Sequence, residues 1–536
     1  MKKLIALLIL ISSLVFCLAS CNKAEGMCVV LTDGYPILTT DMTEKEMRKH
    51  IQPYLFYGIS SDKSAGRKVK NFKIEIPDGI KEGYCELLIT HGKYSCLYST
   101  FIFDKDKLNE VGEFTFYNYE SIDYLVKYNG SDSVVTLPER GEYYLFERAF
   151  TNTLSLERIN LGNSVVDIGF EAFSGCQNLE EISFGTGVKS VQYNAFMGCE
   201  SLSRVEASSL DSWCGIDFFV SYSADSITVD QIDNIINIGT FEKVESDSDI
   251  KFDYTFDSSV STGDLISGGN SFVFVEDGSG VAVDTTVKYE YVSLGDVFSS
   301  ISLIGQSNPL QLAKSLYVQG QRITNLVIPE SVTSIGCYAF YGSDITSVKI
   351  HSGVESIGTG AFSSCDGLRD VQLYSIKSDV VATIKEAFPE AAYVDFNGAK
   401  YLGNKDNQYM ILVSSGTCEG EFTLHEQTLA IGRNAFSGSK GITSVTVHDG
   451  VVIIGDNAFS GLDSGAEVFV GSGVVEMGTR NKTSVVTSAV ASGSGAKITF
   501  ANNDGWYYVN SKDETVYFNI SELTLDNEAH KYKWYR

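Results

Sequence analysis

The stretch VVDIGFEAFSGCQNLEEISF, residues 165–184, decides the fold of this chain. It contains an apolar turn, the dipeptide Ala172-Phe173, a Gly-Cys pair and a final segment in which apolar and polar residues alternate. The Ala-Phe dipeptide recurs at a spacing of twenty-three residues on both sides, at Ala149-Phe150 and Ala195-Phe196. A fixed period of this length predicts a solenoid in which each repeat stacks on the next one.

Further copies of the unit follow in two later parts of the chain. Their Ala-Phe dipeptides stand at Ala339-Phe340, Ala361-Phe362, Ala435-Phe436 and Ala458-Phe459. Ser343 and Ser439 occupy the place of the Cys in two of these copies. Ala387-Phe388 stands twenty-six residues after Ala361, so the sequence leaves open whether it marks a true repeat.

The alternating segment of each copy predicts one short strand per repeat. Parallel strands stacked about 4.8 Å apart would bury a continuous column of Leu, Ile and Val and turn the polar positions outward. Outward rows on such a sheet suit a large ligand and form the predicted ligand-binding ladder; the alternative is that they are only its soluble face. The ladder positions are Arg158, Asn160, Glu181, Ser183, Arg204, Glu206, Asn325, Val327, Ser347, Lys349, Asp370, Gln372, Ser444 and Thr446.

This pattern resembles the BspA-like leucine-rich repeat, a 23-residue class found in surface lipoproteins of host-associated bacteria. The resemblance covers residues 134–214 and 316–500, with imperfect copies inside both ranges. It implies a mainly β, leucine-rich-repeat solenoid whose parallel stacked strands are joined by short helical or 3-10 return segments. It also implies a role in adhesion and coaggregation.

The first residues have the features of a bacterial lipoprotein signal peptide, predicted over residues 1–20. Two lysines precede an apolar run over residues 4–18, and small residues lead into Cys21. Cys21 would become the acylated first residue and hold the mature chain to a membrane, because each buried lipid methylene contributes about 0.8 kcal/mol. The alternatives are an ordinary secretory signal and an uncleaved anchor. Together with the resemblance, the signal predicts a lipid-anchored protein of the bacterial envelope, exposed on the outer membrane.

Residues 21–127 are predicted to form a separate N-terminal β-domain. Strand-like runs at residues 72–76, 84–89 and 98–103 are separated by Gly, Asp and Lys turns, which suggests an immunoglobulin-like sandwich. Residues 43–49 suggest a short helix. Such a domain would act as a spacer between the membrane and the solenoid.

An inserted β-domain is predicted at residues 223–303, where the Ala-Phe signal is missing. Alternating runs at residues 251–256, 271–275 and 287–292 predict its strands. A domain inserted at a break in a solenoid protrudes and often binds ligands, although a passive decoration explains it equally well. The other predicted parts are repeat blocks at residues 128–222, 304–400 and 401–500 and a C-terminal cap at residues 501–536.

The cysteines fall into two groups. Cys176, Cys199 and Cys365 occupy the repeat's own Cys position, which predicts buried and inert thiols. Cys85 and Cys96 lie on successive strand-like runs and could form a disulfide in an oxidising envelope, with free thiols as the alternative. The sequence has no C-x-x-C motif, so zinc-ribbon and thioredoxin chemistry lack their minimum requirement.

The sequence contains no catalytic motif, so no enzyme activity, no cofactor and no metal site are predicted. The G-x-S-x-G, H-E-x-x-H and P-loop patterns are missing. His351 and His448 follow equivalent repeat strands, where a turn position explains them better than catalysis. Asp247, Asp249 and Asp253 suggest a solvated acidic face in preference to a calcium site. The formal net charge of −27, from 41 Lys and Arg against 68 Asp and Glu, disfavours nucleic acid as a partner.

The function that the resemblance implies is protein-protein binding by a surface-anchored lipoprotein, with adhesion to host matrix proteins or to the surface proteins of other bacteria. The alternative is an envelope protein that faces the periplasm and either binds glycans or scaffolds a surface complex. A glycan reader would present exposed aromatic side chains, for which Tyr289 and Tyr291 are candidates.

Overall fold

The computed structural model describes most of the chain after its first 24 residues. The described residues are 25–29, 35–57, 67–77, 79–218, 220–222, 240–245, 250–255, 263–267, 272–276, 301–303, 306–459, 461–463, 465–478, 484–486, 489–491, 496–520, 529 and 532–536. The predicted signal peptide and Cys21 lie outside them, as do Tyr289 and Tyr291. Among the described residues, no helix is long and apolar enough to cross a membrane.

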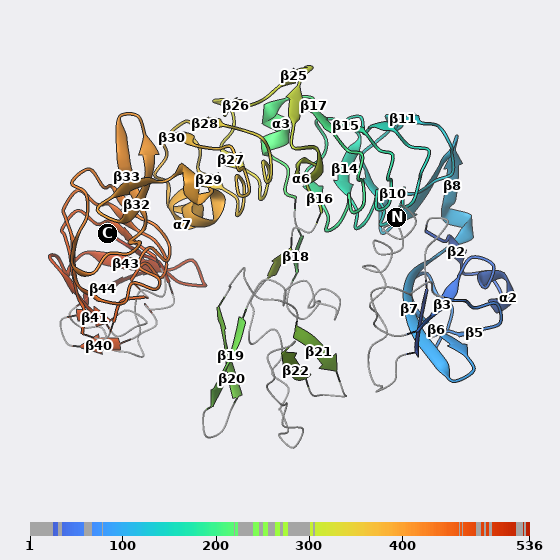
Figure 1. Ribbon diagram of the computed structural model, residues 1–536, viewed down its shortest axis with the longest axis horizontal. Helices are drawn as coiled ribbons and strands as arrows, with labels where there is room; N and C mark the ends of the chain where they lie inside the picture. The colour runs from blue at the N-terminus through green and yellow to red at the C-terminus, as the bar shows by residue number, and fades with distance from the viewer. Residues whose placement is uncertain are drawn as a thin grey trace.

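The repeats form a curved, mainly β solenoid in which a typical repeat contributes one long and one short strand (Figure 1). The long strands form three parallel stacks: β11 (Val134–Thr136), β13 (Arg158–Asn160), β15 (Glu181–Phe184), β17 (Arg204–Ala207) and β24 (Leu316–Val318); β26 (Asn325–Val327), β28 (Ser347–Ile350) and β30 (Asp370–Leu373); and β34 (Gly420–Thr423), β36 (Ile442–Val447), β38 (Glu467–Val470) and β42 (Lys497–Phe500). The short strands also pair in parallel: β12 (Tyr143–Leu145), β14 (Val165–Ile168) and β16 (Ser190–Val191); β27 (Ser334–Ile335) and β29 (Ser356–Ile357); and β35 (Ala430–Ile431), β37 (Ile453–Ile454) and β39 (Glu476–Met477).

The expectation of one strand per repeat is therefore wrong. The second strand arises from the Val-x-x-Ile turn, which recurs in register in successive repeats; Ile168, for example, lies opposite Val191. Its backbone N–H and C=O groups find partners one repeat away, and pairing avoids the cost of burying them unsatisfied. Both sides of a typical repeat are thus held by backbone hydrogen bonds.

The solenoid continues across the inserted residues. β17 pairs directly with β24, with Val205 opposite Leu316, and one hydrophobic core extends from Phe116 to Ala430. Antiparallel pairing of β18 (Val220–Tyr222) with β23 (Ile301–Leu303) marks where the chain leaves and returns. β20 (Ile250–Thr255) and β22 (Phe272–Glu276) confirm two of the predicted strands; they form hairpins with β19 (Thr240–Glu245) and β21 (Gly263–Ser267), whereas residues 287–292 lie outside the described residues.

The phenylalanines of the Ala-Phe dipeptides stack into a ladder inside the solenoid. The ring of Phe173 lies between those of Phe150 and Phe196, with centroid distances of 5.1 and 5.3 Å. The backbone N–H of Phe173 donates to the carbonyl of Ala195 at 2.8 Å, and Phe150 makes the same bond to Ala172. The small Ala side chain allows this close approach of neighbouring turns, so the dipeptide is explained by packing.

Ala387-Phe388 is a true repeat position. Phe388 stacks on Phe362 with a centroid distance of 5.0 Å, and the N–H of Phe362 donates to the carbonyl of Ala387 at 2.8 Å. Helix α7 (Ser378–Ala387) replaces the usual turn and buries Val380 and Ile384. The longer spacing in the sequence is therefore taken up by one helical return segment.

The residue before an Ala-Phe dipeptide adopts a left-handed backbone conformation in all copies except Ala387-Phe388, where Glu386 lies in helix α7. Its φ lies between +51° and +65° at Arg148, Glu171, Asn194, Tyr338, Gly360, Asn434 and Asn457. Gly adopts this conformation freely and Asn at modest cost, whereas a larger side chain is strained there. The same chain reversal thus recurs in these seven copies, even where Tyr, Arg or Glu must occupy the position.

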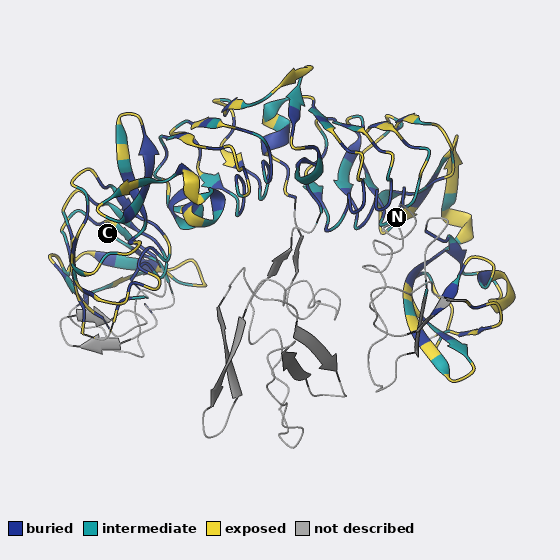
Figure 2. Cartoon of the chain, viewed as in Figure 1, coloured by how far each residue is buried: buried dark blue, intermediate teal, exposed yellow. Residues whose placement is uncertain are grey.

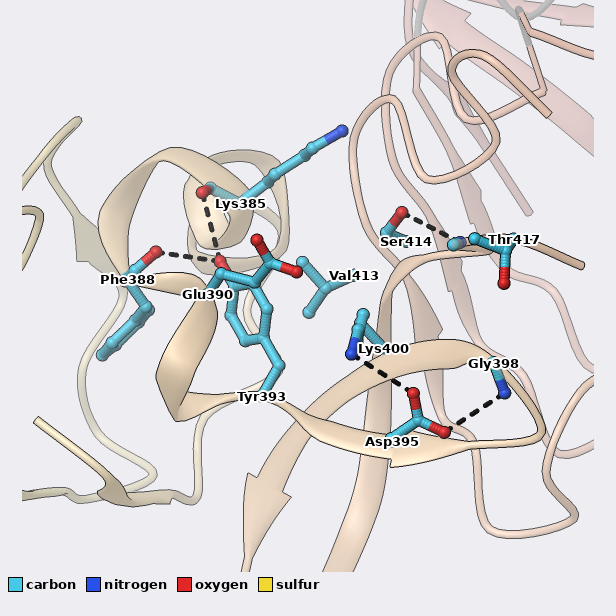
Figure 3. Close-up of a pocket in the computed structure, with 11 residues that line it drawn as sticks. Lys385, Phe388, Glu390, Tyr393, Asp395, Gly398, Lys400, Val413, Ser414 and Thr417 are labelled. Carbon is cyan, nitrogen blue, oxygen red and sulfur yellow. Dashed lines mark hydrogen bonds and ion pairs between the residues drawn. The ribbon is translucent and has the colours of Figure 1, made fainter.

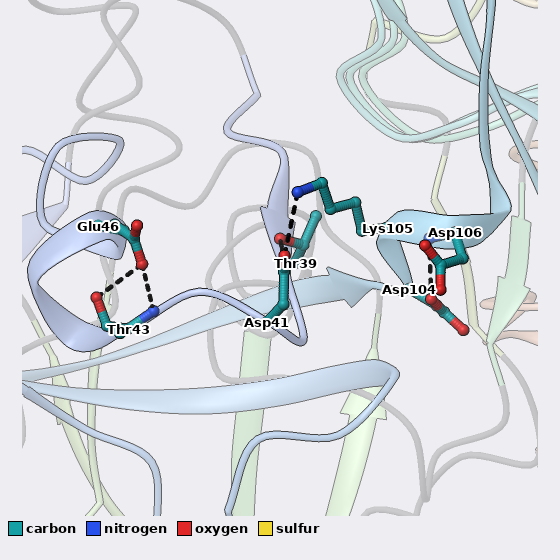
Figure 4. A network of polar contacts seen from close by, with 7 residues as sticks. All are labelled: Thr39, Asp41, Thr43, Glu46, Asp104, Lys105 and Asp106. Atoms are coloured by element: carbon teal, nitrogen blue, oxygen red, sulfur yellow. Dashed lines mark hydrogen bonds and ion pairs between the residues drawn. The ribbon is translucent and has the colours of Figure 1, made fainter.

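The N-terminal part is a separate pair of sheets. One has the strand order β2 (Leu38–Thr39), β7 (Tyr94–Phe103), β6 (Gly83–His91) and β5 (Lys73–Glu75), and the other the order β1 (Glu25–Val29), β3 (Pro53–Tyr57) and β4 (Arg67–Lys68). The three predicted strands are confirmed, as is the short helix, α2 (Glu44–Met47). The N–H and hydroxyl of Thr43 donate to the Glu46 carboxylate at 2.8 and 2.7 Å, which closes a capping box (Figure 4). An immunoglobulin-like arrangement stays a prediction.

Aromatic side chains join the N-terminal sheet to the solenoid. Phe101 and Phe103 of β7 contact Tyr117 of β9 (Phe114–Tyr119) and Phe146, with centroid distances between 5.0 and 5.9 Å. The ion pair of Lys105 with Asp41, at 3.2 Å, adds a polar link within the N-terminal part (Figure 4). β8 (Leu108–Val111), β9 and β10 (Ile122–Tyr128) extend the short-strand sheet, because β10 pairs in parallel with β12. The N-terminal sheet is therefore packed against the first turns of the solenoid.

A second core fills the C-terminal part. The hairpin of β32 (Ala399–Asn404) and β33 (Asn407–Ser414) lies between the two cores, since Leu402 and Met410 belong to the first and Tyr401 and Leu412 to the second. Figure 2 shows buried segments running through the interior along the arch.

The C-terminal end of the solenoid is covered by antiparallel strands. β43 (Trp506–Val509) pairs with β44 (Thr515–Phe518) and with β45 (Trp534–Tyr535), and β45 pairs with β39 of the last short-strand stack. Trp506 and Trp534 are buried with their ring centroids 6.2 Å apart. These indoles cover the apolar end that the last repeat would otherwise expose to water.

Candidate functional site: the outer face of the long strands

The predicted ladder positions all lie on the outer face of long strands, exposed or half-buried, while the residues between them along each strand are buried. Strand register aligns them into rows. Arg158 lies opposite Glu181, and Asn325 lies opposite Ser347, which in turn lies opposite Asp370. In Figure 1, β15, β17, β26, β28 and β30 follow the upper, convex side of the arch, with the short strands beneath them.

Arg204 of the first stack pairs with two carboxylates. The Arg204 guanidinium lies 3.4 Å from the Glu181 carboxylate and 2.6 Å from that of Glu206. It also lies 3.7 Å above the ring of Tyr317, which the register places beside Glu206. This fixed cluster of one cation, two anions and an aromatic ring is suited to recognition by shape and hydrogen bonds. Tyr317 could not be assigned to the row from sequence, because its neighbour Glu206 precedes the inserted residues.

Three apolar side chains stand exposed on this face. Val134 of β11 is 52% exposed, Val327 of β26 is 59% exposed and Phe469 of β38 is 51% exposed. The sequence prediction included Val327. In the third stack it named only positions on β36 and missed the outward residues of β34, β38 and β42, which are Glu421, Thr423, Glu467, Phe469, Lys497 and Thr499. Phe469 lies in register between Thr446 and Thr499. The alternation in AEVFV, which follows Ala458-Phe459 at the spacing seen in the other copies, was the available signal.

The repeat cysteines are buried, as predicted, and they are also hydrogen-bonded. The thiols of Cys176, Cys199 and Cys365 donate to the carbonyl of the phenylalanine one repeat earlier, at distances between 3.0 and 3.2 Å. Burial raises the pKa of Cys176 to about 12 and that of Cys365 to about 11. A thiol that stays protonated and enclosed is a packing element, because only the thiolate is a strong nucleophile.

Cys176 and Cys365 are therefore expected to resist labelling by a thiol reagent in the native protein and to react in urea. An unfolded thiol loses its proton near pH 8.5, before the folded one does. The stability that these thiols contribute is thus complete below about pH 8.5 and is lost as the pH rises toward their folded-state pKa. Peptide mapping by mass spectrometry after labelling at several pH values checks both points. Fast labelling of these two thiols in folded protein at pH 8 would contradict them.

The disulfide that the sequence allowed between Cys85 and Cys96 does not form, and both side chains are buried. The register of β6 and β7 places Cys96 opposite Ile89 and Cys85 opposite Thr100. Ile89, the residue opposite Cys96, is four residues from Cys85 on the same strand, which separates their Cα atoms by roughly 13 Å. A disulfide requires Cα atoms within about 7 Å of each other.

The repeat histidines stabilise turns, as predicted. Nδ1 of His351 accepts from the N–H of Gly353 at 3.1 Å, and Nδ1 of His448 accepts from that of Gly450 at 3.0 Å. Each Nε2 lies 3.0 Å from a carbonyl one repeat earlier. Within the described part of the chain, no group of His, Cys, Asp or Glu side chains could hold a metal ion. The side chains of the three clustered aspartates lie outside the described residues.

A pocket of about 510 Å³ lies between helix α7 and the β32–β33 hairpin. Its polar groups are partly engaged with one another: Lys400 contacts Asp395 at 3.2 Å, and the Tyr393 hydroxyl donates to the Phe388 carbonyl at 2.9 Å (Figure 3). Glu390 and Lys385 also line it. The pocket is open, and its ion pair joins two residues that face each other across neighbouring antiparallel strands.

Comparison with known proteins identifies the repeat. A family model for the BspA type leucine-rich repeat region matches in six copies, over residues 144–260, 311–392 and 417–481. None of the curated proteins compared with the chain matches it.

Several solved structures are similar to the chain at low identity. A leucine-rich cell surface protein of Faecalibacterium prausnitzii is 16% identical, with 74% of this chain and 95% of that chain covered and a TM-score of 0.25. A leucine-rich repeat protein of Bacteroides ovatus is 14% identical, with coverages of 74% and 91% and a TM-score of 0.27. One from Bacteroides capillosus is 21% identical, with coverages of 19% and 81% and a TM-score of 0.18. These values are too low to support an assignment of function.

The family match coincides with the stacked Ala-Phe turns and the paired long strands. A chain that carries this repeat in six copies and folds it into one stacked solenoid belongs to the BspA-type leucine-rich-repeat proteins.

Proposed function

We propose that this protein is a lipid-anchored binding protein of the bacterial surface, which engages a protein ligand through the outer face of its long strands. The observation that carries the proposal is the exposure of Phe469 and Val327 on register-aligned polar rows. Aromatic side chains surrounded by polar neighbours are typical of the residues that dominate binding energy at interfaces.

The solenoid supports this function because its binding face is rigid. The ladder strands lie directly over a stacked core in which Val348, Val445 and Val468 are 1% exposed. A surface that is already ordered loses little conformational entropy on binding. The proposed ligand is a host matrix protein or a surface protein of another bacterium, and the proposed role is non-enzymatic.

The anchor is proposed to be a lipid-modified Cys21 in the outer membrane, with the solenoid outside the cell. The lipoprotein signal and the family's association with bacterial surfaces support this location. The N-terminal sheets would then separate the membrane from the solenoid, and the inserted domain at residues 223–303 would be a second protruding element. Orientation toward the periplasm, with an envelope glycan or a surface complex as partner, is the alternative.

Protease treatment of intact cells tests the location. Loss of the protein from intact cells supports surface display, whereas survival until lysis supports the periplasmic alternative. A Cys21→Ser variant is expected to leave the membrane fraction. Retention of this variant in the membrane would contradict lipid anchoring at Cys21.

A binding assay tests the ligand class. It uses the chain without residues 1–20 and measures binding to immobilised fibronectin, to collagen and to whole cells of neighbouring species. A Phe469→Ala substitution is expected to weaken binding by about tenfold or more, as truncation of a central aromatic side chain does. Leu154→Ala is the matched control, because Leu154 is 54% exposed and lies outside the long strands. Equal binding by the two variants would count against the outer face as the site.

A further inference from the structure

A row of tyrosines crosses the outer face of the C-terminal cap. Tyr507 of β43 lies in register between Tyr517 of β44 and Tyr535 of β45. The ring of Tyr507 has its centroid 5.5 Å from that of Tyr517 and 5.6 Å from that of Tyr535. Tyr517 is 72% exposed, while the other two are half-buried. Three adjacent strands thus present a continuous aromatic strip to solvent, and we name it the tyrosine strip.

The strip is held by a packed layer behind it. Trp506, Tyr508 and Trp534 alternate with the strip residues along the same strands and are buried in the second core. Tyr508 stacks on Tyr532 with a centroid distance of 5.0 Å. The backbone under the tyrosine strip is therefore fixed before any ligand arrives, which lowers the entropy cost of binding.

One end of the tyrosine strip is polar. Glu476 of β39 lies in register beside Tyr535. The Lys533 ammonium lies 3.8 Å from the Glu476 carboxylate and 3.7 Å from that of Asp379, and it donates to the Ser378 hydroxyl at 2.9 Å. The lysine is thus shared between two carboxylates. This end offers hydrogen-bond donors and acceptors, and its Lys533 is already paired with carboxylates.

We propose that the tyrosine strip binds a neutral glycan chain. A sugar ring carries a C–H face that packs on an aromatic ring and a rim of hydroxyls that needs hydrogen-bond partners, which matches an aromatic row with a polar end. A neutral chain also fits the formal net charge of −27, which repels acidic polysaccharides.

A protein partner fits the tyrosine strip less well. A stable protein interface buries about 800 Å² on each side. The tyrosine strip is narrower than such an interface, because each of its three strands contributes one tyrosine. The exposed apolar surface beside the strip on β43 is limited to Val509, which is 40% exposed and follows Tyr507 on the outward face. The tyrosine strip lies on the cap strands and is distinct from the ladder proposed for a protein ligand, so the two proposals can fail independently.

Affinity electrophoresis of the full mature chain in gels that contain mixed-linkage β-glucan, xylan or α-mannan tests the proposal. We expect at least one of these polysaccharides to retard the protein. A Tyr507→Ala/Tyr517→Ala variant should weaken that retardation by about tenfold. Tyr517→Phe keeps the ring and should retain binding. Tyr84→Ala should also retain it, because Tyr84 is 58% exposed on the N-terminal sheet, away from the strip.

Circular dichroism spectra identical to that of the unchanged chain would show that the double variant is folded. Retardation by none of the three polysaccharides would overturn the proposal, as would equal retardation of the double variant. A proline-rich peptide that bound in place of the polysaccharides and required both tyrosines would also overturn it. Binding to fibronectin, collagen or cells, if the ladder mediates it, should be unchanged in the double variant.

Discussion

Replacing Phe173 by alanine is expected to destabilise the solenoid by about 3–5 kcal/mol, the usual cost of removing a buried phenylalanine ring. The side chain of Phe173 has no exposed surface and stacks on a ring from each neighbouring repeat. Its loss therefore opens a cavity and interrupts the ladder between Phe150 and Phe196. Neighbouring repeats cannot close that gap, because their spacing is set by the strands on both sides.

The effect of Phe173→Ala should be local to the first core. Repeat proteins are stabilised mainly by contacts between adjacent repeats, so damage spreads from the altered repeat outward. Hydrogen exchange measured by mass spectrometry should show lost protection around residues 150–214 and retained protection around residues 442–500. The urea midpoint of the first transition should fall as well. Phe469→Ala is the control and should change stability by no more than about 0.5 kcal/mol, because that ring is half exposed. Equal effects of the two substitutions would contradict the ladder as a source of stability.

The repeat was predictable from sequence because its information is local. The Ala-Phe spacing and the alternation around residues such as Ile182 specify the long strands, their buried faces and their outward rows. The inert thiols and the turn histidines followed from the same periodicity. At Ala387-Phe388 the irregular spacing left the outcome open, since only the packing of α7 shows that the ladder is kept.

The remaining features depend on pairing between distant segments. The second strand is as short as the two residues Ser190–Val191, too short for any periodicity to reveal. The register of β6 and β7 keeps Cys85 and Cys96 too far apart for a disulfide, and this register cannot be deduced from the spacing of the cysteines in the sequence. The tyrosine strip likewise exists only because three cap strands align, with Tyr535 far from Tyr507 in the chain and beside it in the sheet.

Replacing Glu171 by leucine is expected to cost about 3–5 kcal/mol, because it leaves a buried arginine without its partner. The Arg148 Nε lies 2.8 Å from the Glu171 carboxylate, and their side chains are 16% and 4% exposed. Both residues precede an Ala-Phe dipeptide in the left-handed conformation, so the stacking of two turns places the charges side by side. The Arg148 guanidinium also lies 5.0 Å from the centroid of the Phe170 ring.

The double variant Arg148→Met/Glu171→Leu should recover most of the stability lost in Glu171→Leu, because it removes the unpaired charge along with its partner. Urea unfolding of the single and double variants gives the coupling free energy as a double-mutant cycle. The Lys400–Asp395 pair supplies the comparison, since its side chains are 33% and 56% exposed and Asp395→Ala should cost no more than about 1 kcal/mol. If Glu171→Leu were as mild as Asp395→Ala, then Arg148 would have found another partner or reached solvent, and the buried pair would not hold the first turns of the solenoid together.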